Sequence, residues 1–227
     1  KSIVVLHACC HNPTGCDLSA SQWAEVVATV KERNLVAFID MAYQGFADGI
    51  KPDALALRLF AASGLQFFVS SSFSKSFSLY GERVGALSIV TASRDESARV
   101  MSQVKRVVRT NYSNPPTHGG AVVAAVLASP ELRKLWEEEL AGMRERIRAM
   151  RTGLVDKLKA RGVAQDFAFV ARQRGMFSYT GLTAEQVERL KSEFGIYAVS
   201  TGRICLAALN TRNLDYVADA IAAVIRK

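Results

Sequence analysis

The stretch Ser70-Ser-Ser-Phe-Ser-Lys-Ser-Phe-Ser-Leu-Tyr-Gly-Glu-Arg-Val-Gly85 decides how the chain is interpreted. It follows a short apolar run typical of a buried strand, and it holds one lysine, Lys75, among hydroxyl groups. Hydroxyl and guanidinium groups bind phosphate well, and a desolvated lysine amine can attack a carbonyl carbon. Although serine-rich loops without a ligand are common, we expect three neighbours of this amine to hold an anion: Ser72, Ser74 and Arg83.

The composition is that of an ordinary globular protein. Of 227 residues, 49% are hydrophobic and 22% are charged, which provides enough apolar material for a core. The formal net charge is +8, but basic and acidic residues alternate, as in 133–139 and 144–148, and do not form a basic block. We therefore expect no nucleic-acid partner, and we interpret the positive excess as suited to an anionic cofactor and acidic substrates.

The sequence contains no run of about 18 apolar residues and no signal-peptide pattern, so we expect no membrane partner. It has four cysteines: Cys9, Cys10, Cys16 and Cys205. The first three lie beside two histidines, but the spacing H-x-C-C-H-x4-C matches no paired-ligand pattern for zinc. We expect no metal, and we interpret these cysteines as buried, reduced residues at a strand end, which is typical of the cytoplasm.

Short apolar runs alternate with helical patterns over residues 1–90. Strands are expected at 2–8, 35–39, 66–70 and 86–90, and helices after the capping box of Ser19 and Gln22 and near 55–63. This alternation predicts an α/β fold with a mostly parallel sheet and helices on both faces. Ligands of such sheets bind beyond the carboxyl ends of the strands. Five residues lie just past the predicted ends and are expected to share one crevice: Asn12, Asp40, Tyr43, Ser72 and Lys75.

The pattern changes in the second half of the chain. Helices are expected at 93–108 and 119–128, and a long helix is expected over about 130–161, starting at Ser129-Pro130 and stopping near Gly162. Short strands near 167–171, 176–179 and 203–207 then alternate with helices at 183–194 and 214–226. We therefore divide the chain into part of a large domain, 1–142, and a small α+β domain, 143–227, joined by the long helix.

Several motifs in order resemble the class I aminotransferases, which are pyridoxal 5′-phosphate enzymes of fold type I. They are Asn12-Pro-Thr-Gly15, Asp40-Met-Ala-Tyr43, Ser72-Phe-Ser-Lys75, Arg83 and Arg203. The aspartate and aromatic amino-acid branch is the most similar, through Cys10-His-Asn-Pro-Thr-Gly15, Ala42-Tyr-Gln-Gly-Phe46, Asn111-Tyr-Ser-Asn-Pro-Pro116 and Gly175-Met-Phe-Ser178. The resemblance runs from residue 1 to 227 and implies the C-terminal portion of such an enzyme: part of the mostly parallel large-domain sheet plus the small α+β domain.

The resemblance also implies a role for each motif residue. Lys75 bonds the cofactor as a Schiff base and then moves the proton from the substrate Cα. Asp40 keeps the pyridine nitrogen protonated, while Tyr43 and Asn12 hydrogen-bond the ring oxygen and tune the pKa of the Schiff base. The phosphate is held by the three residues named above as an anion site.

Substrate recognition is implied for four residues: Asn12, Arg109, Phe177 and Arg203. Arg203 binds the substrate α-carboxylate, and Phe177 lines the pocket near it. Arg109 reaches into the partner subunit and binds the side-chain carboxylate of aspartate, glutamate or 2-oxoglutarate, so a homodimer with a shared active site is implied. Because this arginine occurs in both aspartate and aromatic members, the preferred amino donor stays open.

The implied function is a cytoplasmic ping-pong transaminase that moves the amino group of aspartate or an aromatic L-amino acid to 2-oxoglutarate. The alternatives are another fold type I activity, such as a β-lyase or decarboxylase, and an inactive fragment or binding module. Family members carry an earlier segment with further cofactor ligands, which these 227 residues lack. We therefore expect the native polypeptide to extend well over a hundred residues before Lys1, and the fragment alone to have very low activity.

Overall fold

A computed structural model of the protein describes residues 1–226 and divides the chain into two compact units. Unit 1 comprises residues 1–8, 18–45 and 49–140, and unit 2 comprises residues 9–17, 46–48 and 141–227. Two short loops, 9–17 and 46–48, therefore belong to the second unit although the first surrounds them in sequence. The predicted division after residue 142 ignores these loops and stays a prediction.

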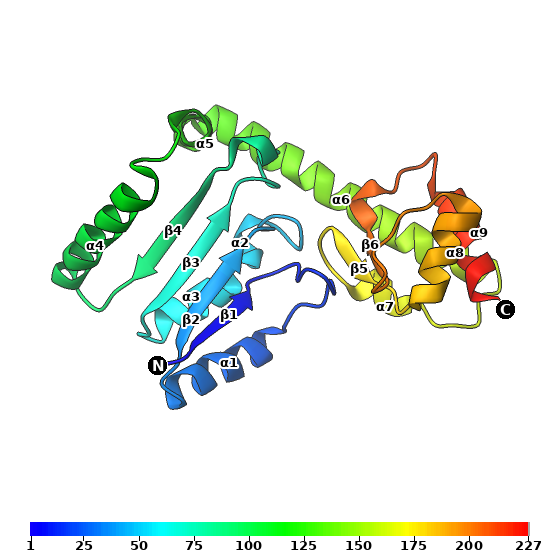
Figure 1. Cartoon of the computed structure of the whole chain (residues 1–227), viewed down its shortest axis with the longest axis horizontal. Helices are drawn as coiled ribbons and strands as arrows, with labels where there is room; N and C mark the ends of the chain where they lie inside the picture. Colours follow the sequence, from blue (N-terminus) through cyan, green and yellow to red (C-terminus); the bar gives the residue numbers. More distant parts are fainter. Residues whose placement is uncertain (227) are drawn as a thin grey trace. The chain divides into compact units, whose positions relative to one another are not determined.

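A four-stranded sheet forms the centre of unit 1 (Figure 1). Its strands, in spatial and sequence order, are β1 (Ile3–His7), β2 (Val36–Met41), β3 (Phe67–Ser72) and β4 (Gly85–Val90). The β1–β2 and β2–β3 pairs are parallel, and β4 is antiparallel to β3. The strands β2 and β3 each run two residues further than predicted, so Asp40 and Ser72 lie inside strands and not beyond them.

Helices α1 (Ala20–Glu32), α2 (Ile50–Asp53) and α3 (Leu55–Ala62) follow the first two strands of unit 1. The predicted capping box of Ser19 and Gln22 starts α1. Trp23 of α1 and Phe60 of α3 are buried in one hydrophobic core with Ile39 of β2. Alternate strand residues therefore face these helices, as expected for a sheet with one face in the core.

The second face of the sheet is contacted by one helix. Helix α4 (Arg94–Tyr112) lines a hollow together with Phe68, Leu87 and Ile89 of the sheet. On β1, however, Ile3 and Val5 are 64% and 67% exposed. Helix α4 also runs four residues past its predicted end, because the helix-incompatible prolines begin only at residue 115.

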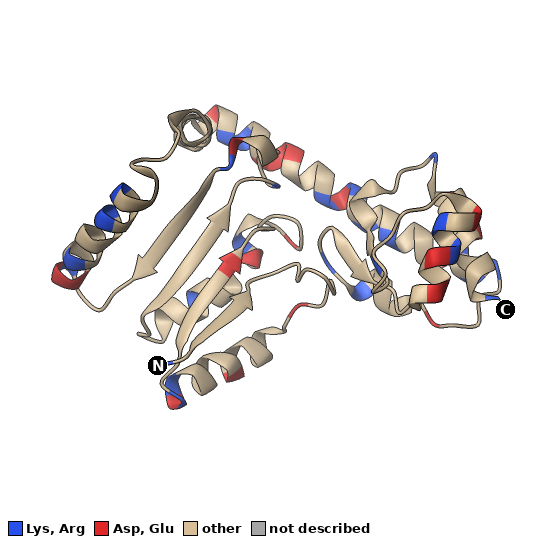
Figure 2. Cartoon of the chain, in the orientation of Figure 1, with Lys and Arg blue, Asp and Glu red and all other residues tan. Residues whose placement is uncertain are grey.

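Helices α5 (Thr117–Ala128) and α6 (Pro130–Ala160) complete unit 1 and lead into unit 2. As predicted, the hydroxyl of Ser129 accepts a hydrogen bond from Leu132 N, at 3.3 Å, in the first turn of α6. Figure 2 shows blue and red residues interspersed along α6, and Arg133 and Glu137 form one of its ion pairs, at 2.9 Å. This mixture confirms a solvated helix face of mixed charge. No described helix is both long and apolar enough to span a bilayer.

Unit 2 contains the second part of α6 and a two-stranded antiparallel sheet of β5 (Phe177–Tyr179) and β6 (Arg203–Cys205). Its other helices are α7 (Ala168–Arg172), α8 (Ala184–Phe194) and α9 (Leu214–Ile225), with short 3-10 turns at Tyr80–Glu82 in unit 1 and Leu206–Ala208 in unit 2. The predicted capping box of Thr183 and Gln186 starts α8.

The strand predicted near 167–171 is wrong, because this segment forms helix α7. The side chain of Asp166 accepts a hydrogen bond from Ala168 N at 2.7 Å, and Val170 is fully buried. A short apolar run cannot be assigned to strand or buried helix from periodicity alone. The polar residue before the run was the signal for a helix start.

Candidate functional site

Five side chains of unit 1 gather at or just beyond the carboxyl ends of β2 and β3. We call them the lysine cluster: Asp40, Tyr43, Ser72, Ser74 and Lys75. The parallel register pairs Asp40 with Ser70, so the two strand ends meet at one edge of the sheet. This is the edge at which open α/β sheets bind ligands.

The carboxylate of Asp40 has partners on both neighbouring strands. The hydroxyl of Ser70 donates to Asp40 Oδ1 at 3.2 Å, and the His7 Nε2 atom lies 3.8 Å from Asp40 Oδ2. His7 ends β1 directly opposite Asp40 in the register. Sequence reasoning treated His7 only as a possible metal ligand, although its place at a parallel strand end was a signal that it could support Asp40.

The amine of Lys75 lies over an aromatic ring. Its Nζ atom is 4.9 Å from the ring centroid of Tyr43, which is 5% exposed. Among the described residues, Lys75 forms no ion pair with a carboxylate. A cation over a ring is held more weakly than a cation in a buried ion pair. This amine therefore has a preferred position but remains available for chemistry.

The loop that carries Lys75 is held by Trp136 of α6. The indole N–H of Trp136 donates to the carbonyl of Ser76 at 2.6 Å, and its ring stacks on Phe77 at 4.5 Å between centroids. Sequence reasoning assigned Trp136 to packing only. Since an indole N–H seeks a partner when it is buried, a tryptophan on this helix face also fixes the backbone of the lysine loop.

The three predicted phosphate ligands are only partly brought together. Ser74 is buried, and its backbone N–H donates to the hydroxyl of Ser72 at 3.2 Å. Arg83 is exposed and has a left-handed backbone, and its guanidinium donates to the carbonyl of Tyr80 at 2.9 Å. The two serines are therefore close neighbours, whereas the guanidinium of Arg83 is directed to its own turn.

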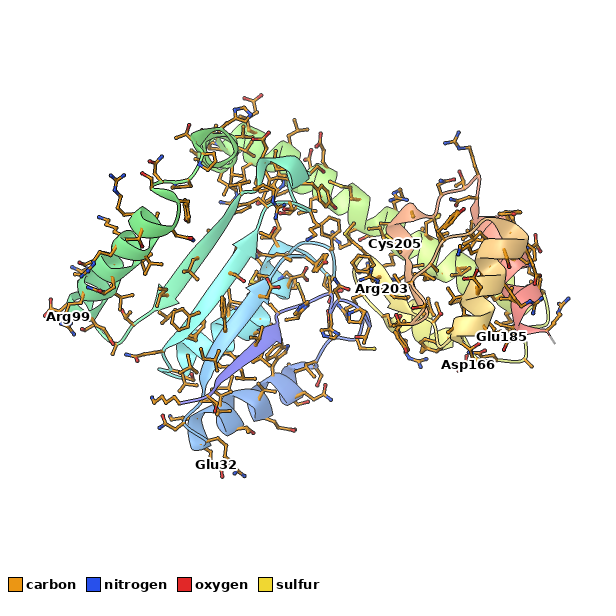
Figure 3. The ribbon with its side chains drawn as sticks, in the orientation of Figure 1. Glu32, Arg99, Asp166, Glu185, Arg203 and Cys205 are labelled. Atoms are coloured by element: carbon orange, nitrogen blue, oxygen red, sulfur yellow. The ribbon has the colours of Figure 1, made fainter. Side chains whose placement is uncertain are left out.

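A second group of predicted residues lies in unit 2, and we call it the Arg203 cluster: Asn12, Phe177 and Arg203. The guanidinium of Arg203 donates to Asn12 Oδ1 at 2.9 Å, and its Cζ atom lies 4.7 Å from the centre of the Phe177 ring. Figure 3 labels Arg203 and Cys205 at the two ends of β6. An arginine held by an amide oxygen and an aromatic face has few orientations, which suits binding of a carboxylate.

The turn that carries Asn12 packs closely on β5. Gly15 has φ +71°, and a Cβ atom there would lie 2.7 Å from the carbonyl oxygen of Phe177, so only glycine fits. The N–H of Arg174 donates to the carbonyl of Gly15 at 2.7 Å. Asp17 accepts hydrogen bonds from the backbone of Cys10 and His11, at 2.7 and 3.0 Å, and closes the turn.

A buried arginine that sequence reasoning missed supports the same strand. Arg151 of α6 is 2% exposed. It donates to four oxygens of unit 2: the carbonyls of Val170, Gly175 and Phe177, at 3.1, 2.8 and 2.5 Å, and the hydroxyl of Ser178, at 2.6 Å. Burial lowers its pKa to about 10, while the Cys10 and Asp17 side chains oppose this shift. Arg151 therefore stays charged at neutral pH, and its position on an otherwise solvated helix gave no sequence signal.

The remaining predicted residues lie elsewhere. Arg109 is exposed near the end of α4 and donates to the hydroxyl of Ser113, and its role toward a partner subunit stays a prediction. Cys9, Cys16 and Cys205 are free thiols, and Cys9 and Cys10 are buried, as expected. Cys16, however, is exposed, contrary to the expectation of a buried residue.

Comparisons with known proteins match nearly the whole chain to aminotransferases. Residues 1–221 match the family model described as aminotransferase class I and II. The chain is 70% identical to an aspartate aminotransferase of Pseudomonas aeruginosa and 52% identical to an aromatic-amino-acid aminotransferase of Escherichia coli, each over 99% of the chain. An aromatic-amino-acid aminotransferase from Burkholderia pseudomallei, covalently bound to pyridoxal phosphate, is 73% identical with a TM-score of 0.98, over 99% of this chain and 56% of that one. The chain spans 56% and 57% of the length of the two curated relatives.

Proposed function

Because the chain belongs to the class I and II aminotransferase family, we propose that it carries the amino-transfer chemistry of a pyridoxal-phosphate enzyme. In this proposal the amino group of an L-amino acid passes to 2-oxoglutarate in two half-reactions. The observation that carries the proposal is the amine of Lys75, which lies over the Tyr43 ring and forms no ion pair with a described carboxylate.

The residues of the lysine cluster fit a phosphorylated pyridine aldehyde. The carboxylate of Asp40 is oriented by Ser70 and His7, and it is suited to accept a proton shared with a ring nitrogen. Phosphate oxygens would be bound by the hydroxyls of Ser72 and Ser74 and, after it turns from the Tyr80 carbonyl, by Arg83. Tyr43 and Asn12 would hydrogen-bond the oxygen on the ring. When bound, the cofactor supplies a ring that accepts the electron pair released at the substrate Cα.

The chain itself supplies the proton transfer. We assign this step to the Nζ atom of Lys75, which would take the proton released at the substrate Cα and carry it to the cofactor. The Nζ atom of Lys75 lies over the ring of Tyr43, and the indole N–H of Trp136 holds the backbone of the loop that carries it.

Carboxylate recognition is assigned to the Arg203 cluster. Arg203 offers planar N–H donors to the substrate α-carboxylate, while Asn12 and the Phe177 ring limit its orientation. The comparisons leave the amino donor open, because the chain is 70% identical to an aspartate enzyme and 73% identical to an aromatic one. Arg109 is proposed to bind the side-chain carboxylate of a dicarboxylate in a partner subunit, in a homodimer.

We also propose a reducing compartment, the cytoplasm, for the protein. Cys9, Cys16 and Cys205 are free thiols, and Cys9 is buried. Unpaired thiols of this kind are typical of cytoplasmic proteins.

An assay of the protein at its native length, with aspartate, tyrosine and phenylalanine as donors, tests the proposed function. With pyridoxal phosphate and 2-oxoglutarate present, we expect formation of glutamate from at least one donor, with ping-pong kinetics. A pyridoxal-phosphate-dependent loss of carbon dioxide or elimination from the donor, without glutamate, would favour a decarboxylase or lyase and contradict the proposal.

A further inference from the structure

A polar hollow of about 400 Å³ lies in unit 2 and shares no residue with the lysine cluster or the Arg203 cluster. It is lined by residues of the loop 46–48, of helix α6 and of the segment 171–175. We call it the arginine hollow because five of its residues are arginines: Arg144, Arg148, Arg151, Arg172 and Arg174. Asp48 is the one acidic residue among the described residues that line it.

Acidic partners neutralise only part of this charge. Asp48 pairs with Arg148, at 3.3 Å, and with Arg174. Glu145, which does not line the hollow, pairs with Arg148 at 3.2 Å and also with Arg144. With Asp17, whose charge acts on Arg151, three carboxylates oppose five guanidinium groups, and the difference of two positive charges produces a positive potential in the hollow.

Two of the five arginines form no ion pair among the described residues. Arg172 is exposed and forms no ion pair with a described carboxylate. The terminal N–H groups of Arg151 donate to carbonyl and hydroxyl oxygens, and its Nε atom has no hydrogen-bond partner in the described chain. A buried donor without a hydrogen-bond partner is rare in proteins, and it adds to the attraction for an anion.

We propose that the arginine hollow binds a small dianion with carboxylate or phosphate oxygens. Arg172 at the rim is the primary contact, Arg148 and Arg174 provide further donors, and Arg151 contributes its charge from beneath. Planar guanidinium groups match the paired oxygens of both anion types, so phosphate and dicarboxylate share this chemistry. None of its residues is proposed to contact the cofactor or the substrate, and Arg151 acts there only as a structural support of β5.

The test uses an Arg83→Gln/Arg109→Gln/Arg203→Gln background, in which the other three arginines proposed to bind anions are removed. Inorganic phosphate and succinate are titrated separately at constant ionic strength, and the Nε–H signal of Arg151 is followed by NMR. We expect a saturable shift of this signal with at least one anion, and the tighter of the two identifies the ligand source. Arg172→Gln should weaken binding about tenfold or more, whereas Arg212→Gln, an exposed arginine of unit 2 outside the hollow, should leave it unchanged.

The thermal unfolding midpoint without anion serves as the folding control for each variant. If Arg172→Gln lowers that midpoint, Arg172→Lys replaces it, because this variant keeps the charge and should retain part of the affinity. Absence of a saturable shift with both anions in the background protein would overturn the proposal. Equal weakening by the variants at Arg172 and Arg212 would overturn it too, because it would indicate general charge screening.

Discussion

The lysine cluster and the Arg203 cluster place one cation each, but they do so in different ways. Lys75 follows a six-residue strand of a four-stranded sheet. Its Nζ atom lies 4.9 Å from the centre of the Tyr43 ring. Arg203 starts a three-residue strand and is fixed by an amide oxygen at 2.9 Å and a ring at 4.7 Å. A strong scaffold thus carries a loosely bound amine, whereas a small scaffold carries a tightly oriented guanidinium. This difference suits an amine that moves protons and an arginine that recognises a carboxylate.

Removal of the Lys75 amine is the most severe test of this difference between the lysine cluster and the Arg203 cluster. In Lys75→Ala, we expect the rate of amino transfer to fall by about 10²–10⁴-fold or more, because the group that moves the proton is lost. Single-turnover absorbance measurements with the preferred donor would give this rate. Lys105→Ala, which removes an exposed lysine of α4, should leave the rate unchanged. A rate within a few-fold of the parent for Lys75→Ala would mean that another base acts.

The small scaffold of the Arg203 cluster depends on Arg151. Arg151→Met leaves three carbonyls and the Ser178 hydroxyl without their donor, so we expect the free energy of unfolding of unit 2 to fall by about 3–5 kcal/mol. Urea unfolding would measure the loss, with Arg212→Met as the exposed control. A change below about 1 kcal/mol would show that the carbonyls find other donors.

A conservative change at Arg203 tests whether the orientation of its guanidinium matters for recognition. Arg203→Lys keeps the positive charge but loses the planar pair of donors, so we expect affinity for succinate or 2-oxoglutarate to fall by about ten- to a hundredfold. Titration calorimetry would measure this affinity. An affinity equal to that of the parent would indicate that charge alone, and not orientation, governs recognition.

The smallest expected effect concerns an exposed ion pair that joins α9 to the end of α6. The hydrogen bond from Arg161 lowers the pKa of Asp219 below its usual value. The folded state therefore gains stability at pH values above the unfolded pKa of about 3.9, and this gain is lost as the pH falls through the lowered pKa.

Asp219→Asn should consequently reduce the pH dependence of the unfolding midpoint between neutral and strongly acidic pH. At neutral pH it should lower the stability of the fold by less than Arg151→Met does. Asp156→Asn removes an aspartate of α6 that forms no ion pair with a described residue, and it should leave that dependence unchanged. Identical pH profiles for both variants and the parent would show that the pair adds nothing measurable, as is true of many exposed pairs.

The motif order predicted the family and the fold class correctly, and both are confirmed. Residues at strand ends could be located because parallel strands bring their carboxyl ends to one edge, and Asp40 and Lys75 lie at or near that edge, while their roles stay a prediction. The supports of those residues could not be predicted. Trp136 lies 61 positions from Lys75 and resembles any apolar residue of an amphipathic helix, and Arg151 resembles its solvated neighbours. Their roles depend on tertiary contacts that no local pattern encodes.

Two helices were predicted incorrectly because short sequence patterns fit more than one secondary structure. The run 167–171 is too short for its periodicity to separate a strand from helix α7. Helix α4 continues through Arg109 because only the prolines at 115 and 116 exclude helical backbone.

The central claim is that the amine of Lys75 is the group that bonds the cofactor. The most direct measurement is to add pyridoxal phosphate, reduce with borohydride and map the labelled peptide by mass spectrometry. The account predicts a label on Lys75 and its loss in Lys75→Ala, with the other lysines unlabelled at low cofactor concentration. A label spread over exposed lysines, or one that persists in Lys75→Ala, would contradict it.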